Sequence, residues 1–195
     1  DKSVWFQGRA AWTFANLYNT VEKNPVWLEV SRSCLAFLRD RCRGIDGKLY
    51  FTVTREGRPL RMRRYVYSEC FAAIAAAAFG KATGDQNAAD EAVRYFSTYL
   101  DHSFRMGVMP PKTDPEVRPM KGLAPYMITI ITAQEIRANL GDISVEGRTC
   151  TEWIDRSIAE IERDFYKPEL GAVMEVVGPG GQIIDHFDGR TLNPG

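Results

Sequence analysis

The sequence lacks the features that mark several large classes of protein. It has two histidines and four cysteines, and no two cysteines have the close spacing of a zinc knuckle. Lysine plus arginine and aspartate plus glutamate are equal at 25 each, so no excess of positive charge attracts nucleic acid or an anionic membrane. No apolar run approaches the roughly 18 residues that a membrane-spanning helix needs. We therefore expect neither nucleic acid nor a membrane as partner.

Signals for secretion and for cofactor attachment are also missing. Residues 1–7 do not have the pattern of a signal peptide, and no Asn-x-Ser/Thr glycosylation site is present. The four cysteines are then expected to be free thiols in a reducing compartment, which predicts a cytoplasmic protein. The glycine-rich residues 178–181 lack the Lys-Ser/Thr of a phosphate loop, and nothing indicates a cofactor or a metal.

What the sequence does contain is helical periodicity. In the second predicted helix, Asn24 and Pro25 have the residue types of an N-cap and a first helical position, and apolar residues then recur every three or four positions. The same reasoning predicts six helices, over residues 4–21, 24–44, 68–80, 87–100, 123–140 and 147–166. The proline-rich residues 105–119 must be a loop.

Two stretches have strand character instead. Residues 48–62 and 172–184 each predict a β-hairpin, the second turning at residues 178–181. The two stretches resemble each other, which indicates a weak repeat of helix pairs. Such pairs bury their apolar faces by stacking, either as an open solenoid or as a closed ring. Hairpins and a proline loop gathered at one rim favour an all-α ring, of which residues 1–195 form a single domain and about half.

A few polar side chains in apolar surroundings are candidates for function. Arg9 lies among aromatic residues and could bind an oxyanion, or else form structural salt bridges or face solvent. Glu69 could line a site or merely favour the start of its helix. Glu175 alternates with Val173 and Val177, so it should face the core with them and be paired there or bind substrate. His102 lies at a helix end, where we expect it to be exposed, and His186 lies in a loop. The two histidines have no spacing that argues for a catalytic pair.

Four local patterns together resemble the N-acylglucosamine 2-epimerase family. Residues 5–12 contain a Gln-Gly-Arg-x-x-Trp motif, and residues 67–71 read Tyr-Ser-Glu-Cys-Phe. Residues 119–121 read Pro-Met-Lys. Residues 189–195, Gly-Arg-Thr-Leu-Asn-Pro-Gly, give the most specific match. The resemblance covers most of the chain.

The resemblance implies a twelve-helix (α/α)6 barrel, of which this chain holds three helix pairs, and a catalytic histidine directly after Gly195. It implies an isomerase that interconverts N-acetylglucosamine and N-acetylmannosamine, or related aldoses, through an enediolate, without a cofactor and often as a homodimer. Arg9 matches the family's essential arginine and is the expected catalytic residue. The residues expected to contact the sugar or to shape its site are Tyr67, Glu69, Trp12, Lys121, Glu175 and Asn193.

Other functions stay open at this point. An aldose–ketose isomerase of the mannose type would use the same fold and intermediate. Pro125, Tyr126 and Met127 stand where cellobiose-type members of the family carry histidines, which argues against a cellobiose substrate. A non-catalytic helical-repeat binding protein would need no chemistry. A glycoside hydrolase would need paired acids such as Asp185 and Asp188.

Overall fold

The computed structural model describes residues 1–61, 66–108 and 113–185 of the chain. These residues form six α-helices: α1 (Val4–Thr20), α2 (Pro25–Arg41), α3 (Tyr67–Thr83), α4 (Gln86–Phe104), α5 (Ala124–Leu140) and α6 (Cys150–Glu160). A π-helical turn, Ile161–Phe165, continues α6. All six predicted helices are therefore confirmed, with small shifts at their ends.

Local capping explains where several helices begin. The side chain of Asn24 accepts a hydrogen bond from the backbone N–H of Val26 at 3.0 Å, and Pro25 takes the first position of α2. At α6, Thr149 and Glu152 form a reciprocal capping box. The helix consequently begins at Cys150, and the prediction of a start at Gly147 is wrong.

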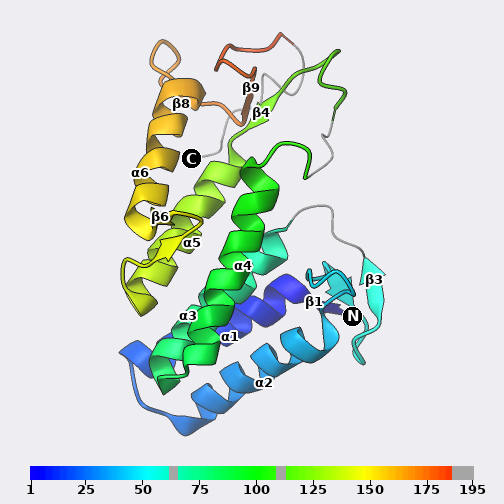
Figure 1. Cartoon of the computed structure of the whole chain (residues 1–195), viewed down its shortest axis with the longest axis vertical. Coiled ribbons are helices and arrows are strands. Elements are labelled where there is room, and N and C mark those ends of the chain that lie inside the picture. The colour runs from blue at the N-terminus through cyan, green and yellow to red at the C-terminus, as the bar shows by residue number, and fades with distance from the viewer. Residues whose placement is uncertain (62–65, 109–112, 186–195) are drawn as a thin grey trace.

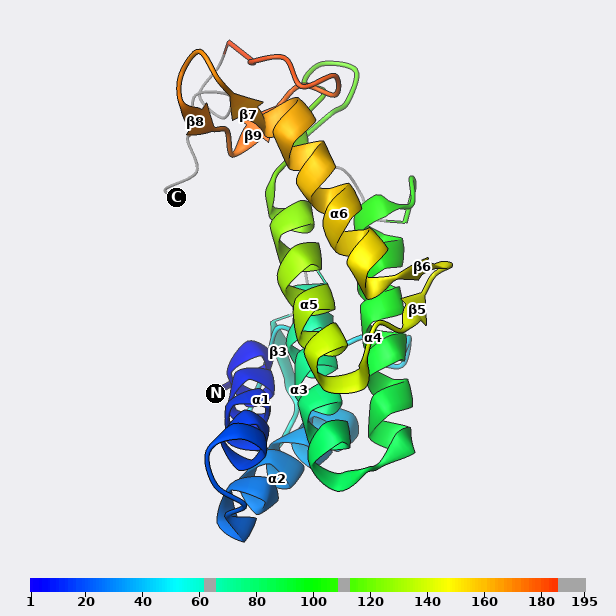
Figure 2. The same ribbon diagram turned by 90° about the vertical axis from the view of Figure 1, so that its left-hand side faces the viewer.

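The helices form two rows of three (Figures 1 and 2). Helix α3 packs against α1 on one side and α5 on the other, which gives an α1–α3–α5 row. Helix α2 packs on α1 and α3, α4 packs on α3, and α6 packs on α5, which gives an α2–α4–α6 row. The three predicted helix pairs are confirmed, and this is the arrangement of an (α/α) barrel over about half of its ring. We call the face of the α1–α3–α5 row that is turned away from the α2–α4–α6 row the inner face.

Alanines in the middle helix explain why the rows pack closely. Six alanines of α3 have almost no exposed surface: Ala72, Ala73, Ala75, Ala76, Ala77 and Ala78. A methyl side chain lets neighbouring helix backbones approach, so α3 can be surrounded on several sides at once. None of the described helices combines the length and the apolar character needed to cross a membrane.

Apart from one hairpin between α5 and α6, the short strands lie along the edge of the α1–α3–α5 row where these three helices begin (Figure 1). We call this edge the rim. Strands β1 (Lys2–Ser3), β2 (Thr52–Val53) and β3 (Pro59–Arg61) form a three-stranded antiparallel sheet. The hairpin predicted at residues 48–62 is thus confirmed over its described part, and the N-terminal residues add a strand that the sequence did not predict.

The second predicted hairpin is wrong. Strand β8 (Ala172–Val173) pairs with β7 (Tyr166–Lys167), whereas β9 (Val176–Val177) pairs with β4 (Lys121–Gly122). Residues 178–182 do form a tight turn, in which the N–H of Gly178 donates to the carbonyl of Gln182 at 2.8 Å. The strands beside it pair with other partners, so the turn closes no hairpin. A separate hairpin, β5 (Ser144–Val145) with β6 (Arg148–Thr149), joins α5 to α6.

Candidate functional site

Arg9 lies on the inner face, in the second turn of α1. Its side chain is exposed, and its guanidinium carbon lies 4.8 Å from the centre of the Phe71 ring on α3. The preceding residue makes this contact geometrically possible. A Cβ on Gly8 would come within 2.7 Å of the Cβ of Phe71, so only glycine allows α1 to approach α3 this closely. The adjacent Gly-Arg of the motif therefore combines a helix contact with an exposed cation above an aromatic ring.

The Phe71 ring beneath Arg9 belongs to an aromatic cluster at the rim. The ring of Trp5 lies 5.5 Å from that of Phe71 and 6.1 Å from that of Tyr67. The indole N–H of Trp5 donates to the hydroxyl of Ser68 at 3.1 Å, and this hydroxyl donates to the carbonyl of Tyr50 at 3.0 Å. Trp5 is therefore fixed in one orientation, and half-buried Tyr67 is placed beside it.

Trp12 lies deeper on the same face. Its indole N–H donates to a carboxylate oxygen of Glu135 on α5 at 2.8 Å. Sequence reasoning missed Glu135, because a glutamate within a helical pattern is normally a solvated surface residue. Only its contact with a residue 123 positions away distinguishes it.

Lys121 is tied into an ionic cluster. Its ammonium group binds Glu160 at 2.6 Å and also Asp164, and Arg163 binds the same two carboxylates, each at 2.8 Å. The hydrogen bond from Arg163, with a further one from Lys121, outweighs desolvation and holds the pKa of Asp164 at about 2. Desolvation lowers the pKa of Lys121, but its hydrogen bonds to both carboxylates raise it by more. Lys121 therefore fastens β4 to the end of α6.

Glu69 has a structural contact. It is buried, and one of its oxygens accepts the backbone N–H of Leu49 at 2.8 Å. The carboxylate thereby holds the loop before β2 against the first turn of α3. A contact between Glu69 and substrate stays a prediction.

Glu175 lies between β8 and β9 and is half-buried. Met174 and Val177 are the buried residues of this stretch, whereas Val173 is half-buried. Val177 belongs to a core cluster and Val173 packs against it, as predicted, but Met174 between them is buried as well. The strand is interrupted there, so the predicted alternation does not continue to Glu175. The prediction for Asn193 lies outside the described residues, as do those for His186 and Asp188.

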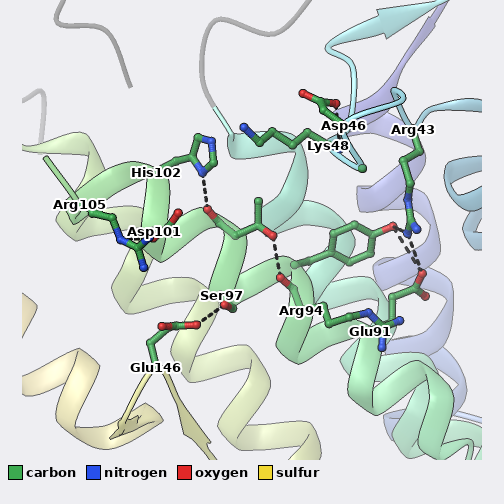
Figure 3. Close-up of a pocket in the computed structure, with 13 residues that line it drawn as sticks. Arg43, Asp46, Lys48, Glu91, Arg94, Ser97, Asp101, His102, Arg105 and Glu146 are labelled. Atoms are coloured by element: carbon green, nitrogen blue, oxygen red, sulfur yellow. Dashed lines mark hydrogen bonds and ion pairs between the residues drawn. The ribbon is translucent and has the colours of Figure 1, made fainter. Parts of the chain in front are cut away.

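A polar cavity of about 520 Å³ lies elsewhere, against α4 (Figure 3). Its walls come from α4, from the loop after α2 and from Glu146 at the turn of the β5–β6 hairpin. It contains none of the predicted site residues. His102 lines it and is half-buried, so the prediction that His102 is exposed is wrong. The Nδ1 atom of His102 lies 2.9 Å from the carbonyl of Thr98, one turn earlier on α4.

We place the candidate site on the inner face and not at the α4 cavity, because the cavity is lined by none of the predicted site residues. Arg9, Trp12 and Tyr67 all lie there or at its rim, and the structure brings them together from two helices of one row. Among the described residues, no group of three or more His, Cys, Asp or Glu side chains is placed to hold a metal ion.

These features define a protein of the (α/α)-barrel class with an arginine and aromatic side chains on its inner face. Comparison with known proteins agrees. The model of the N-acylglucosamine 2-epimerase (GlcNAc 2-epimerase) family matches residues 1–195. The N-acylglucosamine 2-epimerase of Homo sapiens is 29% identical over 203 aligned positions, which cover 100% of this chain and 46% of that protein. The chain belongs to the N-acylglucosamine 2-epimerase family.

Solved structures share the fold. The cellobiose 2-epimerase of Bacillus thermoamylovorans B4167 superimposes with a TM-score of 0.77 at 16% identity, over 94% of this chain and 50% of that one. A D-mannose isomerase superimposes with a TM-score of 0.69 at 15% identity, over 94% of this chain and 46% of that one. The chain thus spans about half the length of the relatives and structures that it matches.

Proposed function

We propose that the full natural chain containing this sequence is a sugar 2-epimerase that interconverts N-acetylglucosamine and N-acetylmannosamine or related aldoses. The observation that carries the proposal is the placement of Arg9. This residue is the arginine of the family motif, and its guanidinium group is exposed on the inner face, above Phe71 and beside an ordered aromatic cluster.

The chemistry needs a cation at this place. Removing the C2 proton of an open-chain aldose gives an enediolate, whose negative charge is shared by the oxygens on C1 and C2. A guanidinium group offers several donors in a fixed plane and stays charged at all working pH values, so it stabilises this charge without a proton transfer of its own. Returning the proton to the opposite face of C2 gives the epimer, and delivering it to C1 gives the ketose. The proposal includes no metal and no redox cofactor.

Two groups must move the protons, and the histidine among the described residues is not on the inner face. His102 lies in the cavity at α4, on the α2–α4–α6 row. The proposal therefore assigns charge stabilisation and sugar binding to the residues described here, and proton transfer to other residues of the full chain. Asn193 belongs to the proposal as a residue that shapes the loop presenting such a group.

The remaining predicted residues have different roles in the proposal. Trp12 and Tyr67 are the aromatic surfaces against which the sugar packs. Lys121 and Glu69 support the rim through their ion pairs and hydrogen bond, and a direct sugar contact stays a prediction for both. Glu175, half-buried at the rim, stays a candidate contact.

The test is proton NMR of the full natural chain in D₂O with N-acetylmannosamine, N-acetylglucosamine and mannose. We expect loss of the C2 proton signal and growth of the epimer, and Arg9→Met should slow both by about 100-fold or more. Arg32→Met is a matched control, because Arg32 on α2 also lies over an aromatic ring, that of Phe79, at 5.2 Å. Exchange that continues unchanged in Arg9→Met would remove Arg9 from the mechanism.

Two outcomes favour other functions. A ketose product would identify an aldose–ketose isomerase, as in the D-mannose isomerase that shares the fold. The absence of exchange with all three sugars, from folded protein, would favour another sugar or a non-catalytic binding role.

Three further expectations belong to this proposal. Cys34, Cys42, Cys70 and Cys150 are free thiols, which supports a cytoplasmic location. A homodimer is proposed from the family resemblance alone, and sedimentation of the full chain tests it. Residues 1–195 are proposed to belong to a single domain.

A further inference from the structure

The hydrogen bond between Trp12 and Glu135 joins two helices that are not neighbours in their row. Helix α3 lies between α1 and α5, and its other side is covered by α2 and α4. The bond from Trp12 to Glu135 must therefore cross α3 on the inner face. The small alanine side chains of α3 leave room for this bridge, since a bulky α3 would hold α1 and α5 further apart.

Two other hydrogen bonds of α1, one on each side of Trp12 along the helix, show where the Trp12–Glu135 bridge crosses α3. Nearer the rim, Trp5 donates to Ser68 of α3, and further from it Asn19 donates to the carbonyl of Ala78 at 2.9 Å. Residues 5, 12 and 19 follow one another at seven-residue steps, or about two helical turns, so they lie along one side of α1. The bridge thus crosses the middle of α3.

Arg9 lies just above this bridge. It precedes Trp12 by three residues, which is about 4.5 Å along the helix axis, and residues at this spacing lie on the same face. Trp12 is half-buried, so part of its surface remains open to the inner face. A sugar held at Arg9 from the rim would have the indole beneath it.

We infer that Glu135 is a positioning residue that holds the indole of Trp12 as the floor of the sugar site beneath Arg9. An indole has one polar atom, so a single hydrogen bond to that atom selects one orientation of the ring. The ring then offers a fixed apolar surface to the C–H groups of a sugar, while Arg9 meets its oxygens. This inference rests on the proposed function, and it adds a residue of α5 to a site otherwise built from α1 and α3.

The hydrogen bond is tested through the tryptophan indole N–H signals in NMR spectra of the full natural chain. The Trp12 signal is assigned by its loss in Trp12→Phe. Glu135→Leu should move that signal and leave those of Trp5, Trp27 and Trp153 in place, whereas Glu29→Leu, at an exposed site on α2, should move none of the four. An unmoved Trp12 signal in Glu135→Leu would overturn the inference.

Kinetics test the floor itself. We expect Glu135→Leu to raise the KM for the sugar by about 10-fold, with kcat within about 3-fold of the wild type, and Glu135→Gln to restore most of the loss because an amide oxygen still accepts. Trp12→Phe should resemble Glu135→Leu. A role limited to fold stability would lower the melting temperature and leave KM unchanged, and that result would overturn the inference.

The two proposals can fail separately. If the wild-type chain exchanges no C2 proton of any sugar, the proposed function fails. The role of Trp12 as the floor of a sugar site then fails as well, even if Glu135→Leu moves the indole signal of Trp12. If the wild type turns sugar over and all Glu135 variants keep its KM, the proposed function stands and the positioning role of Glu135 is wrong.

Discussion

The carboxylate of Glu69 accepts a hydrogen bond from the backbone N–H of Leu49 at 2.8 Å, with both residues almost completely buried. This bond ties the first turn of the central helix to the chain that enters β2. The sequence gives no hint of this contact, since Glu69 has the position of a first-turn carboxylate that favours the helix dipole.

We expect Glu69→Ala to lower the free energy of unfolding by about 3 kcal/mol, because it removes the carboxylate that accepts from the buried N–H of Leu49 and opens a small cavity. Glu69→Gln should cost less than Glu69→Ala, since the amide oxygen can still accept from the N–H of Leu49. Urea unfolding of the full natural chain measures both, with Glu56→Ala in the exposed turn between β2 and β3 as control. Equal stability of Glu69→Ala and the wild type would show that the bond contributes nothing.

Gly8 gives a second prediction, on the contact between α1 and α3. Alanine is the better helix former by about 1 kcal/mol. At Gly8, however, its Cβ would lie 2.7 Å from the Cβ of Phe71 and 2.9 Å from its carbonyl carbon, and a backbone atom cannot rotate away. We therefore expect Gly8→Ala to destabilise by about 1–3 kcal/mol despite its helix propensity.

The matched change is Gly122→Ala, because a Cβ on Gly122 meets no atom within 4 Å. It should alter the free energy of unfolding by less than about 0.5 kcal/mol. A Gly8→Ala variant as stable as Gly122→Ala would mean that α1 and α3 can separate at no cost.

The helices were predictable from the sequence because their signals are local. Asn24 with Pro25 and the three- and four-residue apolar spacing act within one segment, so six helices and their pairing follow from neighbouring residues. The hairpin at residues 172–184 failed because strand pairing is not local. Val176 and Val177 have strand character, yet which strand they pair with depends on Lys121 and Gly122, far away in the sequence.

The residues of the candidate site also fall into those that the sequence could predict and those that only the fold reveals. Motif resemblance identified Arg9 and Trp12, and the structure places both on one face of α1. Glu135 could not be predicted, since its only distinguishing feature is a partner on another helix. Lys121 was predicted by its motif, but only the fold shows that Glu160 and Asp164 bind it.

The ionic cluster around Asp164 predicts how stability responds to acid. Its folded-state pKa of about 2 lies below the ordinary value of 3.8, chiefly because Arg163 and Lys121 donate to its charged form. A lowered pKa means that the stabilisation is complete above about pH 4 and is lost as the pH falls through about 2. We expect a loss on the order of 1–2 kcal/mol, reduced from the full shift because Arg163 is largely exposed.

Thermal unfolding between about pH 2 and pH 6 measures this loss. Asp164→Asn should start less stable and lose less stability on acidification, whereas Asp155→Asn, at an exposed site on α6, should follow the wild type. Parallel curves for Asp164→Asn and the wild type would show that other carboxylates carry the acid sensitivity.

Arg9→Lys separates the shape of the cation from its charge. Lysine keeps the positive charge but has neither the planar fork of donors nor a flat group to lie over Phe71, from which the guanidinium carbon is 4.8 Å away. If Arg9 stabilises an enediolate, kcat/KM should fall by about 100-fold, equivalent to about 3 kcal/mol of transition-state stabilisation. Because Arg9 is exposed, the melting temperature should stay close to that of the wild type, and Arg32→Lys should change neither quantity. A wild-type kcat/KM in Arg9→Lys would mean that any cation at this position suffices, and the enediolate would then have to be recognised by donors from elsewhere in the barrel.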